Sequence, residues 1–436
     1  MPSKKKELKS IKSSLLSRSF SVARLGLGAG LKYAGSRISK TPLDDFLNSQ
    51  AVHFTKELGE LKGSLMKAGQ MLSMYGEYFF PPQANLILKS LQSESPPIEW
   101  PTMKKYLTKY LGAALLAELE VDPVSIGAAS MGQVHKAKIK KTGEWIALKI
   151  QYPDVDKAID SDVSALKTLL KFSKLIPSSI DLTAVFDEIK MMLRQELDYH
   201  HEAQLTRKYR QLIKDDSRYV VPEVFERFSN KKVLATEYIE GLRADDPLVQ
   251  ALSQKRRNHI SESFLDIYFK EIFDWNLIQT DPHLGNYKIQ IDPLGHDRLV
   301  LLDFGACREF SEPFMKNYRH MIKGSILKDR KMFLGAAEKM GFVIKADPPE
   351  YIKAFEEFCY ETVEPFTTEG TYHWKQSDLP GRVVKKAIQF KNFDLRSPPR
   401  EILFLDRKTG GVFIFMSVMK ADYNARKIID PYLIDV

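Results

Sequence analysis

The sequence predicts an α+β protein of two lobes, one built around strands and the other mainly helical. The first observation is residues 123–150, where apolar strand-like runs are separated by a turn of small residues and by Thr142-Gly143. The second is the chain from Glu312 onward, which is mostly helical in pattern and is interrupted by proline pairs. A length of 436 residues leaves room for two lobes and a large core.

Composition excludes several classes of protein. Hydrophobic residues make up 44% of the chain and charged residues 28%, which is ordinary for a folded soluble protein. The two cysteines, Cys307 and Cys359, are too few for a disulfide framework or a cysteine-based zinc site, and they fit a reducing compartment. No apolar run approaches the ~20 residues that span a bilayer. We therefore expect no transmembrane segment.

The formal charge of +9 is concentrated at the N-terminus. Residues 1–40 hold ten Lys or Arg and one acid, and the remainder of the chain is balanced. This arm is a disordered tail, a membrane-surface segment or, least favoured because it is rich in lysine, a transit peptide. Residues 20–36 fit a weakly amphipathic helix or a flexible basic leader equally well. The charge lies in one arm without interleaved aromatic residues, so we expect no nucleic-acid partner.

Two helical stretches carry charged residues at notable positions. Residues 43–93 have apolar residues at helical spacing around Lys67, Gly69 and Gln70, and Pro81-Pro82 ends the stretch. Residues 181–212 predict one long helix that bears Glu196, Asp198 and Glu202. Asp198 and Glu202 are four residues apart, so we expect them to share a face of that helix.

The predicted strands deliver a lysine and a turn. Lys149 closes the apolar strand E-W-I-A-L-K-I, where a strand lysine can hold nucleotide phosphates. The turn before it is poor in glycine and includes Ala128, Ala129 and Ser130. Its backbone N–H groups can face a phosphate, but the Cβ atoms of these residues restrict how closely the phosphate can approach. A further apolar strand at 233–238 leads out of this region, and we assign Glu237 at its end to the nucleotide site.

The most informative stretch is residues 278–309. Asp281 lies five residues before Asn286, and a short apolar run then leads into Asp303-Phe304-Gly305. In kinase chemistry the first Asp faces the attacking hydroxyl, and the Asn and second Asp hold Mg²⁺ on the nucleotide phosphates. The amide oxygen of the Asn and the carboxylate of the second Asp both suit this hard cation. The alternative is an ordinary turn after a core strand, which the matching Asp281–Asn286 spacing disfavours.

The order strand Lys, helix Glu, crossover strand, Asp-x-x-x-x-Asn and Asp-Phe-Gly is similar to that of protein kinases. Gln279-Thr280-Asp281-Pro282-His283 stands in place of His-Arg-Asp, and no Ala-Pro-Glu motif follows. With the Lys-x-Gly-Gln motif at 67–70, the alanine-bearing turn and the Glu-x-Asp motif at 196–198, the chain resembles the UbiB family of atypical kinases, which includes the ADCK and AarF-related proteins. The resemblance runs from about Ser21 to near Leu433, and the tail P-P-R-E-I-L-F-L-D-R-K-T-G-G-V-F looks like the coenzyme Q-supporting branch.

The resemblance implies an atypical protein-kinase-like two-lobe fold with an N-terminal helical extension packed over the active site. It implies that Lys149 binds phosphates and pairs with Glu202, that Asp281 is at the catalytic-base position, and that Asn286 and Asp303 hold Mg²⁺. Lys67 and Gln70 would reach over the site, with Lys67 meeting Glu196 and Asp198. We accordingly expect a basic arm, a helical extension, a small lobe and a large lobe at 1–40, 41–115, 116–240 and 241–436.

The implied function is an ATPase or phosphotransferase with ATP and Mg²⁺ as cofactors that supports ubiquinone synthesis. The alternatives are a kinase for a small molecule or lipid and an ATP-gated scaffold of a biosynthetic complex. Expected partners are an anionic membrane surface and quinone-biosynthesis proteins or lipid precursors. The expected location is the bacterial cytoplasm, peripheral to the inner membrane, in preference to the mitochondrial matrix.

Overall fold

The computed structural model describes residues 64–79, 97–128, 131–172, 183–389 and 399–434. The chain divides into two compact units, which are described separately below. Unit 1 comprises the chain up to Arg207 together with Glu223–Tyr238, and unit 2 comprises Lys208–Pro222 together with Ile239–Val436. None of the helices in the described ranges combines the length and apolar character needed to cross a membrane. The predicted basic arm at 1–40 lies outside the described residues.

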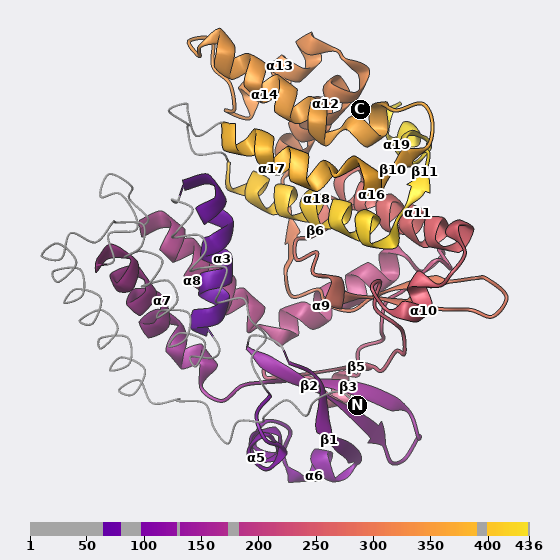
Figure 1. The fold of residues 1–436 in the computed structure, drawn as a ribbon. Helices are drawn as coiled ribbons and strands as arrows, with labels where there is room; N and C mark the ends of the chain where they lie inside the picture. The colour runs from indigo at the N-terminus through magenta and orange to yellow at the C-terminus, as the bar shows by residue number, and fades with distance from the viewer. Residues whose placement is uncertain (1–63, 80–96, 129–130, 173–182, 390–398, 435–436) are drawn as a thin grey trace, which may run out of the picture. The chain divides into compact units, whose positions relative to one another are not determined.

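Unit 1 contains a four-stranded antiparallel sheet, labelled in Figure 1. Its strands occur in the order β1 (Leu119–Ala128), β2 (Gly132–Ile139), β3 (Trp145–Gln151) and β5 (Val233–Glu237). Ile146, Leu148 and Ile150 of β3 are buried. Because side chains alternate along a strand, Lys149 belongs to the opposite face. The strands predicted at 123–150 and 233–238 are therefore present, and they bring Lys149 opposite Val134 and Leu234.

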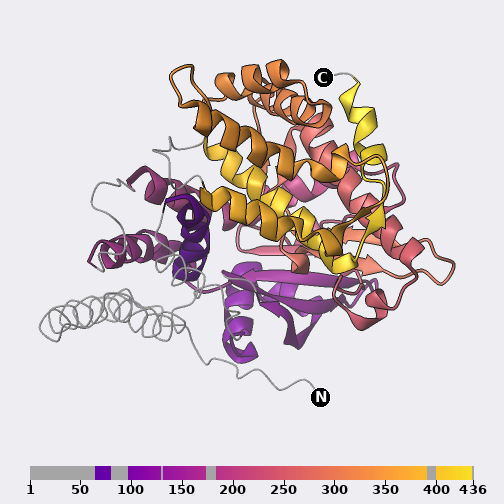
Figure 2. The same ribbon diagram turned by 45° about the horizontal axis from the view of Figure 1, so that its top comes forward.

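Unit 1 also contains several helices. In addition to the 3-10 turn η1 (Glu226–Phe228), they are α3 (Ser64–Phe79), α5 (Trp100–Leu111), α6 (Ala113–Ala117), α7 (Val155–Phe172), α8 (Thr183–Glu196) and the start of α9 (Tyr199–Leu212). Helix α3 packs against both α7 and α8, and Figures 1 and 2 show the three side by side. The buried hydroxyl of Ser64 donates to Asp162 Oδ2 of α7 at 2.5 Å, which ties the start of α3 to that helix.

The single long helix predicted at 181–212 is wrong. The chain breaks after Glu196 and starts again as α9 at Tyr199. The Asp198 carboxylate accepts hydrogen bonds from the backbone N–H groups of His200 and His201, both at 3.1 Å, and so caps α9. An aspartate that satisfies the free N–H groups of a first turn favours a helix start over a helix interior. Asp198 consequently does not share a helix face with Glu202.

Unit 2 contains short strand pairs around the stretch 278–309. Strand β6 (Leu277–Gln279) pairs antiparallel with β9 (Cys307–Glu309), and β7 (Tyr287–Gln290) pairs antiparallel with β8 (Arg298–Leu301). Strand β4 (Tyr219–Val220) runs parallel to β8. The predicted apolar strand before Asp303 is β8, whose Leu299, Val300 and Leu301 are buried. The turn η3 (Leu284–Asn286) joins β6 to β7.

The rest of unit 2 is mainly helical, as predicted. Helix α11 (Gln254–Lys270) continues into a π-helical turn, η2 (Glu271–Trp275). The remaining elements are α10 (Pro247–Gln250), α12 (Glu312–Leu327), α13 (Arg330–Lys339), α14 (Pro349–Thr362), α15 (Glu364–Thr367), β10 (Tyr372–His373), α16 (Trp374–Ser377), α17 (Leu379–Gln389), α18 (Arg400–Met419), β11 (Asp422–Tyr423) and α19 (Arg426–Leu433).

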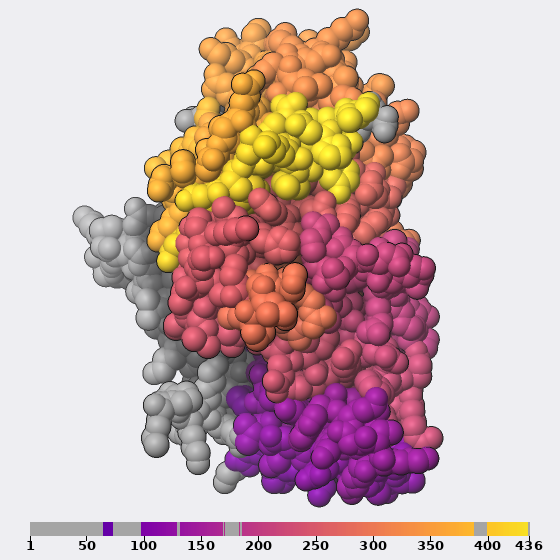
Figure 3. All heavy atoms as spheres, turned by 90° about the vertical axis from the view of Figure 1, so that its right-hand side faces the viewer, coloured from indigo at the N-terminus to yellow at the C-terminus, as the bar shows by residue number. Residues whose placement is uncertain are grey.

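Helix α18 forms part of the core of unit 2. Its side chains Val412, Phe413, Phe415, Met416 and Met419 are almost completely buried. It packs against α11, α16 and α17, and the two long helices α17 and α18 run alongside each other in Figure 1. In the space-filling view of Figure 3 the yellow C-terminal segment lies against the rose-coloured part of the chain that includes α11. Burial of these apolar side chains fixes α18 in the unit.

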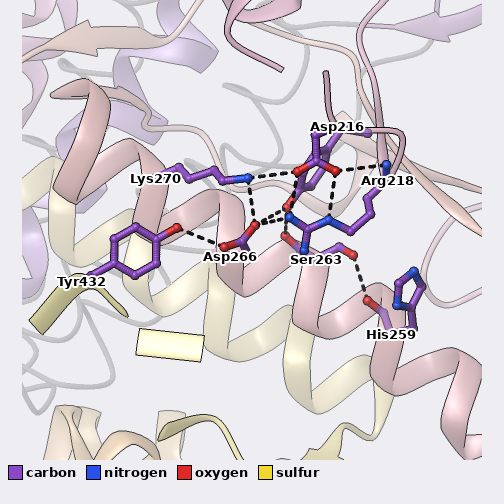
Figure 4. Close-up of polar contacts among 8 residues, drawn as sticks. Asp216, Arg218, His259, Ser263, Asp266, Lys270 and Tyr432 are labelled. Carbon is purple, nitrogen blue, oxygen red and sulfur yellow. Dashed lines mark hydrogen bonds and ion pairs between the residues drawn. The ribbon is translucent and has the colours of Figure 1, made fainter. Parts of the chain in front are cut away.

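A cluster of charged residues fastens the segment 213–220 to α11 and α19 (Figure 4). Asp216 and Asp266 each lie within 3.0 Å of Lys270 Nζ, and Arg218 contacts both carboxylates. The Tyr432 hydroxyl of α19 donates to Asp266 at 3.0 Å. Hydrogen bonds from Arg218 hold the pKa of Asp216 well below its usual range, so this carboxylate stays ionised near neutral pH. The cluster is a structural joint within unit 2.

Candidate functional site

Lys149 and Glu202 form a buried, bidentate ion pair in unit 1. The Lys149 Nζ atom lies 2.7 Å from Glu202 Oε1 and 2.9 Å from Oε2, and the side chains are 15% and 3% exposed. Lys149 comes from β3 and Glu202 from the first turn of α9, which Asp198 caps. The sequence-predicted pair is thus brought together. A glutamate fixed at a helix start holds the lysine in one orientation on the sheet.

The turn between β1 and β2 is only partly described. Ala128 ends β1, whereas Ala129 and Ser130 lie outside the described residues. At Gly132, which starts β2, a Cβ atom would lie 2.6 Å from the Ile150 carbonyl oxygen and 2.7 Å from the Tyr199 hydroxyl. Only glycine allows this approach of the turn to β3 and α9. Glu237 lies at the exposed end of β5, where its carboxylate accepts from the Glu223 N–H at 3.3 Å.

The Lys-x-Gly-Gln motif lies on α3. The Lys67 Nζ atom is 2.8 Å from Glu196 Oε1 at the end of α8, with side chains 10% and 20% exposed. Gln70 is half-buried on the same helix. The structure therefore brings Lys67 to the first acid of the Glu-x-Asp motif, and the second acid, Asp198, caps α9. Both acids of the motif are close to the start of the helix that carries Glu202.

The catalytic-type loop of unit 2 is held by its own amide side chains. Asn286 Nδ2 donates to the Asp281 carbonyl oxygen at 3.0 Å. Gln279, which is buried, donates from Nε2 to the carbonyl oxygens of Asp281 at 2.8 Å and of Asp303 at 3.3 Å. One amide group therefore connects the Asp281 loop to the Asp-Phe-Gly segment. The Asp303 carboxylate accepts from the Gly305 N–H at 2.9 Å, which orients it locally.

Asn286 and Asp303 have the donor chemistry of a partial Mg²⁺ site. They line one small cavity of unit 2 together with Tyr287 and Leu302. The Asn286 hydrogen bond to Asp281 uses the amide nitrogen, and the amide oxygen is the atom suited to a cation. Within the described ranges no group of three or more His, Cys, Asp or Glu could hold a metal by itself. Two protein oxygens fit Mg²⁺, which commonly takes its remaining ligands from phosphates and water.

Sequence reasoning missed Arg407 and Lys408 of α18. Arg407 Nη2 lies 2.6 Å from Asp281 Oδ1, with side chains 30% and 19% exposed. Lys408 Nζ lies 2.8 Å from Glu271 Oε2, and both of these side chains are buried. Burial raises the pKa of Glu271, against the effect of the Lys408 charge. The R-K-T-G-G string is visible in the sequence, but no spacing rule connects it to a loop 126 residues away.

Cys307 is a buried residue behind this loop. Burial raises the pKa of its thiol well above the ordinary value, which disfavours the thiolate form that acts as a nucleophile. Cys307 is buried at the start of β9. Burial and a raised thiol pKa argue against Cys307 as a nucleophile.

Comparison with known proteins decides the family. Residues 90–336 match the ABC1 atypical kinase-like domain. The chain belongs to this family. It is 31% identical over 402 residues to the atypical kinase coq-8 of Caenorhabditis elegans, covering 92% of this chain and 53% of that protein. It is 29% identical to the atypical kinase COQ8 of Saccharomyces cerevisiae, covering 98% of this chain and 86% of the yeast protein. Both relatives are named as mitochondrial.

A solved structure supports the same fold for this ABC1 family member. The complex of Rv3197 with erythromycin from Mycobacterium tuberculosis has a TM-score of 0.61 and 25% identity, covering 89% of this chain and 96% of that one. The chain spans about half the length of the worm relative it matches. The predicted UbiB-type family, the α+β atypical kinase-like fold and the kinase-like enzyme class are confirmed.

Proposed function

We propose that this ABC1 family member binds MgATP and uses it as an atypical kinase or ATPase that supports the synthesis of ubiquinone or a similar prenyl quinone. The observation that carries the proposal is the Lys149–Glu202 pair, with both carboxylate oxygens within 2.9 Å of Nζ. In kinase-like enzymes a strand lysine held by a helix glutamate binds the nucleotide phosphates. The relatives named atypical kinases COQ8 support the quinone context.

The proposed roles of the residues in unit 2 follow from the chemistry of their side-chain oxygen atoms. Asn286 and Asp303 would hold Mg²⁺, which neutralises phosphate charge when bound. Asp281 would accept or orient the proton of the attacking hydroxyl or water. The hydrogen bonds that the Gln279 side chain donates to the Asp281 and Asp303 carbonyl oxygens keep these two segments at a fixed separation. Ala128, Ala129, Ser130 and Glu237 stay predicted nucleotide contacts.

We further propose that α3 is a lid on the nucleotide-binding residues of unit 1. Lys67 supplies a cation to Glu196, which otherwise would add a second carboxylate near Glu202 and repel phosphate. The Ser64–Asp162 hydrogen bond fixes the start of the lid against α7. Gln70 and Asp198 are the remaining proposed members of this group. A lid of this kind would exclude a protein hydroxyl and leave ATP turnover as the main reaction.

The proposed partners are ATP, a quinone precursor and an anionic membrane surface. Residues 1–40 hold ten of the chain's basic side chains, and each Lys or Arg near an anionic surface contributes on the order of 1 kcal/mol. This supports peripheral attachment through the arm. Attachment to the inner membrane from the bacterial cytoplasm stays a prediction, and the mitochondrial names belong to the relatives.

The first test is the thermal stabilisation of the protein by MgATP, compared with ATP plus a chelator. A ligand present at a hundred times its dissociation constant stabilises a protein by about 2.7 kcal/mol. We expect Asp303→Asn to lose most of the Mg²⁺-dependent stabilisation, because it replaces the carboxylate that suits the cation. The control is Asp215→Asn, an exposed aspartate of the same unit, which should behave as wild type. Equal stabilisation of wild type and Asp303→Asn would contradict the metal assignment.

A further inference from the structure

Helix α18 contacts the catalytic-type loop through two residues one turn apart. Arg407 forms its ion pair with the Asp281 carboxylate, and Gly411 lies against Pro282, the next residue of the loop. Residues four apart lie on the same face of a helix, so Arg407 and Gly411 form one contact surface. We call Arg407 and Gly411, together with Lys408, which acts through Glu271, the loop-contact residues of α18. Both partners belong to unit 2.

Gly411 permits a close approach that no other residue type allows. A Cβ atom at this position would lie 2.2 Å from both Cβ and Cγ of Pro282 and 3.3 Å from its carbonyl oxygen. The pyrrolidine ring is rigid and cannot move away alone, so the loop or the helix would have to shift. The neighbouring Gly410 has no atom within 4 Å of the same point. The requirement for glycine is therefore specific to position 411.

Lys408 reaches the same loop by a second route. Its ammonium group pairs with Glu271, and the Glu271 Oε1 atom accepts from the Gln279 N–H at 3.4 Å and the Tyr209 hydroxyl at 3.2 Å. The Gln279 side chain in turn donates to the carbonyl oxygens of Asp281 and Asp303. Because the pair is fully buried, its geometry is fixed by these hydrogen bonds and not by solvent. Lys408 therefore acts on Gln279 through Glu271, and Arg407 acts on Asp281, two residues further along the chain.

We propose that α18 is the positioning element of the catalytic loop. Arg407 pairs with one carboxylate oxygen of Asp281 and so fixes the direction of the other. Gly411 allows Pro282 to pack directly against the helix. Lys408 holds Gln279 in place through Glu271. This deepens the proposed function and rests on Asp281 taking part in turnover. The loop-contact residues are positioning residues, since they act through Asp281 and the loop backbone. An active-site group displaced by about 1 Å can cost roughly a hundredfold in rate.

The decisive comparison is between alanine substitutions at two adjacent glycines of the same helix. Gly411→Ala should lower kcat for ATP by about tenfold to a hundredfold, with KM for MgATP changed less than about threefold. Gly410→Ala should keep both constants within about twofold of wild type. Hydrogen–deuterium exchange of the peptide spanning Thr280–Tyr287 should increase in Gly411→Ala alone. Equal exchange in the two variants, or increased exchange with unchanged kcat, would overturn the proposal.

A second test uses Arg407, where the substitution adds no atom between the helix and the loop. Arg407→Met keeps the apolar stem of the side chain but removes the guanidinium, so kcat should fall by about tenfold or more at unchanged MgATP stabilisation. Arg407→Lys should recover part of that loss because it restores the charge without the planar fork. An Arg407→Met protein with wild-type kcat would overturn the role of the ion pair. If wild type itself neither binds nor turns over MgATP, the proposed function fails, and the exchange comparison alone then decides on the positioning role.

Discussion

The Asp281→Asn protein is expected to turn over ATP about a hundredfold to ten-thousandfold more slowly than wild type, the range that positioned general acid–base groups contribute. The substitution keeps the shape of the side chain and removes the charge that accepts a proton. It also weakens the ion pair with Arg407, which holds this carboxylate at 2.6 Å. MgATP stabilisation should stay close to wild type, because Asn286 and Asp303 are unchanged.

The measurement is phosphate release at saturating MgATP together with the thermal shift of the same preparations. Asp215→Asn serves as the control for loss of a carboxylate from unit 2, and it should retain full activity. Turnover of Asp281→Asn within about twofold of wild type would remove this residue from the chemistry. A parallel loss of nucleotide binding would instead assign Asp281 to the binding of MgATP.

The Lys67→Ala protein is expected to show a new activity, either phosphate incorporation into itself or an altered preference among nucleotides. Lys67 is the cation 2.8 Å from Glu196, and both side chains are largely buried. Removing one partner of a buried pair costs ~3–5 kcal/mol in measured cases. Part of that cost should appear as loosening of α3, which would open the lid and admit a hydroxyl acceptor.

Incorporation of labelled phosphate and affinities for ATP and ADP should be measured on Lys67→Ala and on Lys105→Ala. Lys105 is an exposed lysine of α5 in the same unit, so its removal tests for a general effect of charge. We expect Lys105→Ala to match wild type in both measurements. If Lys67→Ala also matches wild type, the lid model is wrong and the pair with Glu196 is only structural.

The local parts of the fold could be predicted from the sequence because short-range patterns determine them. The strands around Lys149 follow from apolar runs bounded by turn residues, and β8 follows from the apolar run before Asp303. The break between α8 and α9 was missed, although its signal was present. The Asp198 carboxylate accepts hydrogen bonds from the N–H groups of His200 and His201. Aspartate is a common residue immediately before the first turn of a helix.

The contacts of α18 could not be predicted in the same way. Arg407 and Asp281 are 126 residues apart, and neither a charge nor a glycine identifies its partner by itself. Gly410 and Gly411 look equivalent in the sequence, yet only the second lies against Pro282. A tertiary contact of this kind depends on which face of α18 meets the loop. The residues of these contacts can be read in the sequence, but their roles and their pairing required the structure.

This ABC1 family member is proposed to use MgATP through Lys149, Asp281, Asn286 and Asp303. The most direct measurement is the release of inorganic phosphate from ATP by the purified full chain, with Mg²⁺ and with a chelator. The same assay should be repeated with anionic liposomes and a phenolic quinone precursor. The expected result is turnover that requires Mg²⁺, falls at least about a hundredfold in Asp281→Asn, and increases when liposomes and precursor are added. Absence of both nucleotide binding and phosphate release under all of these conditions would contradict it.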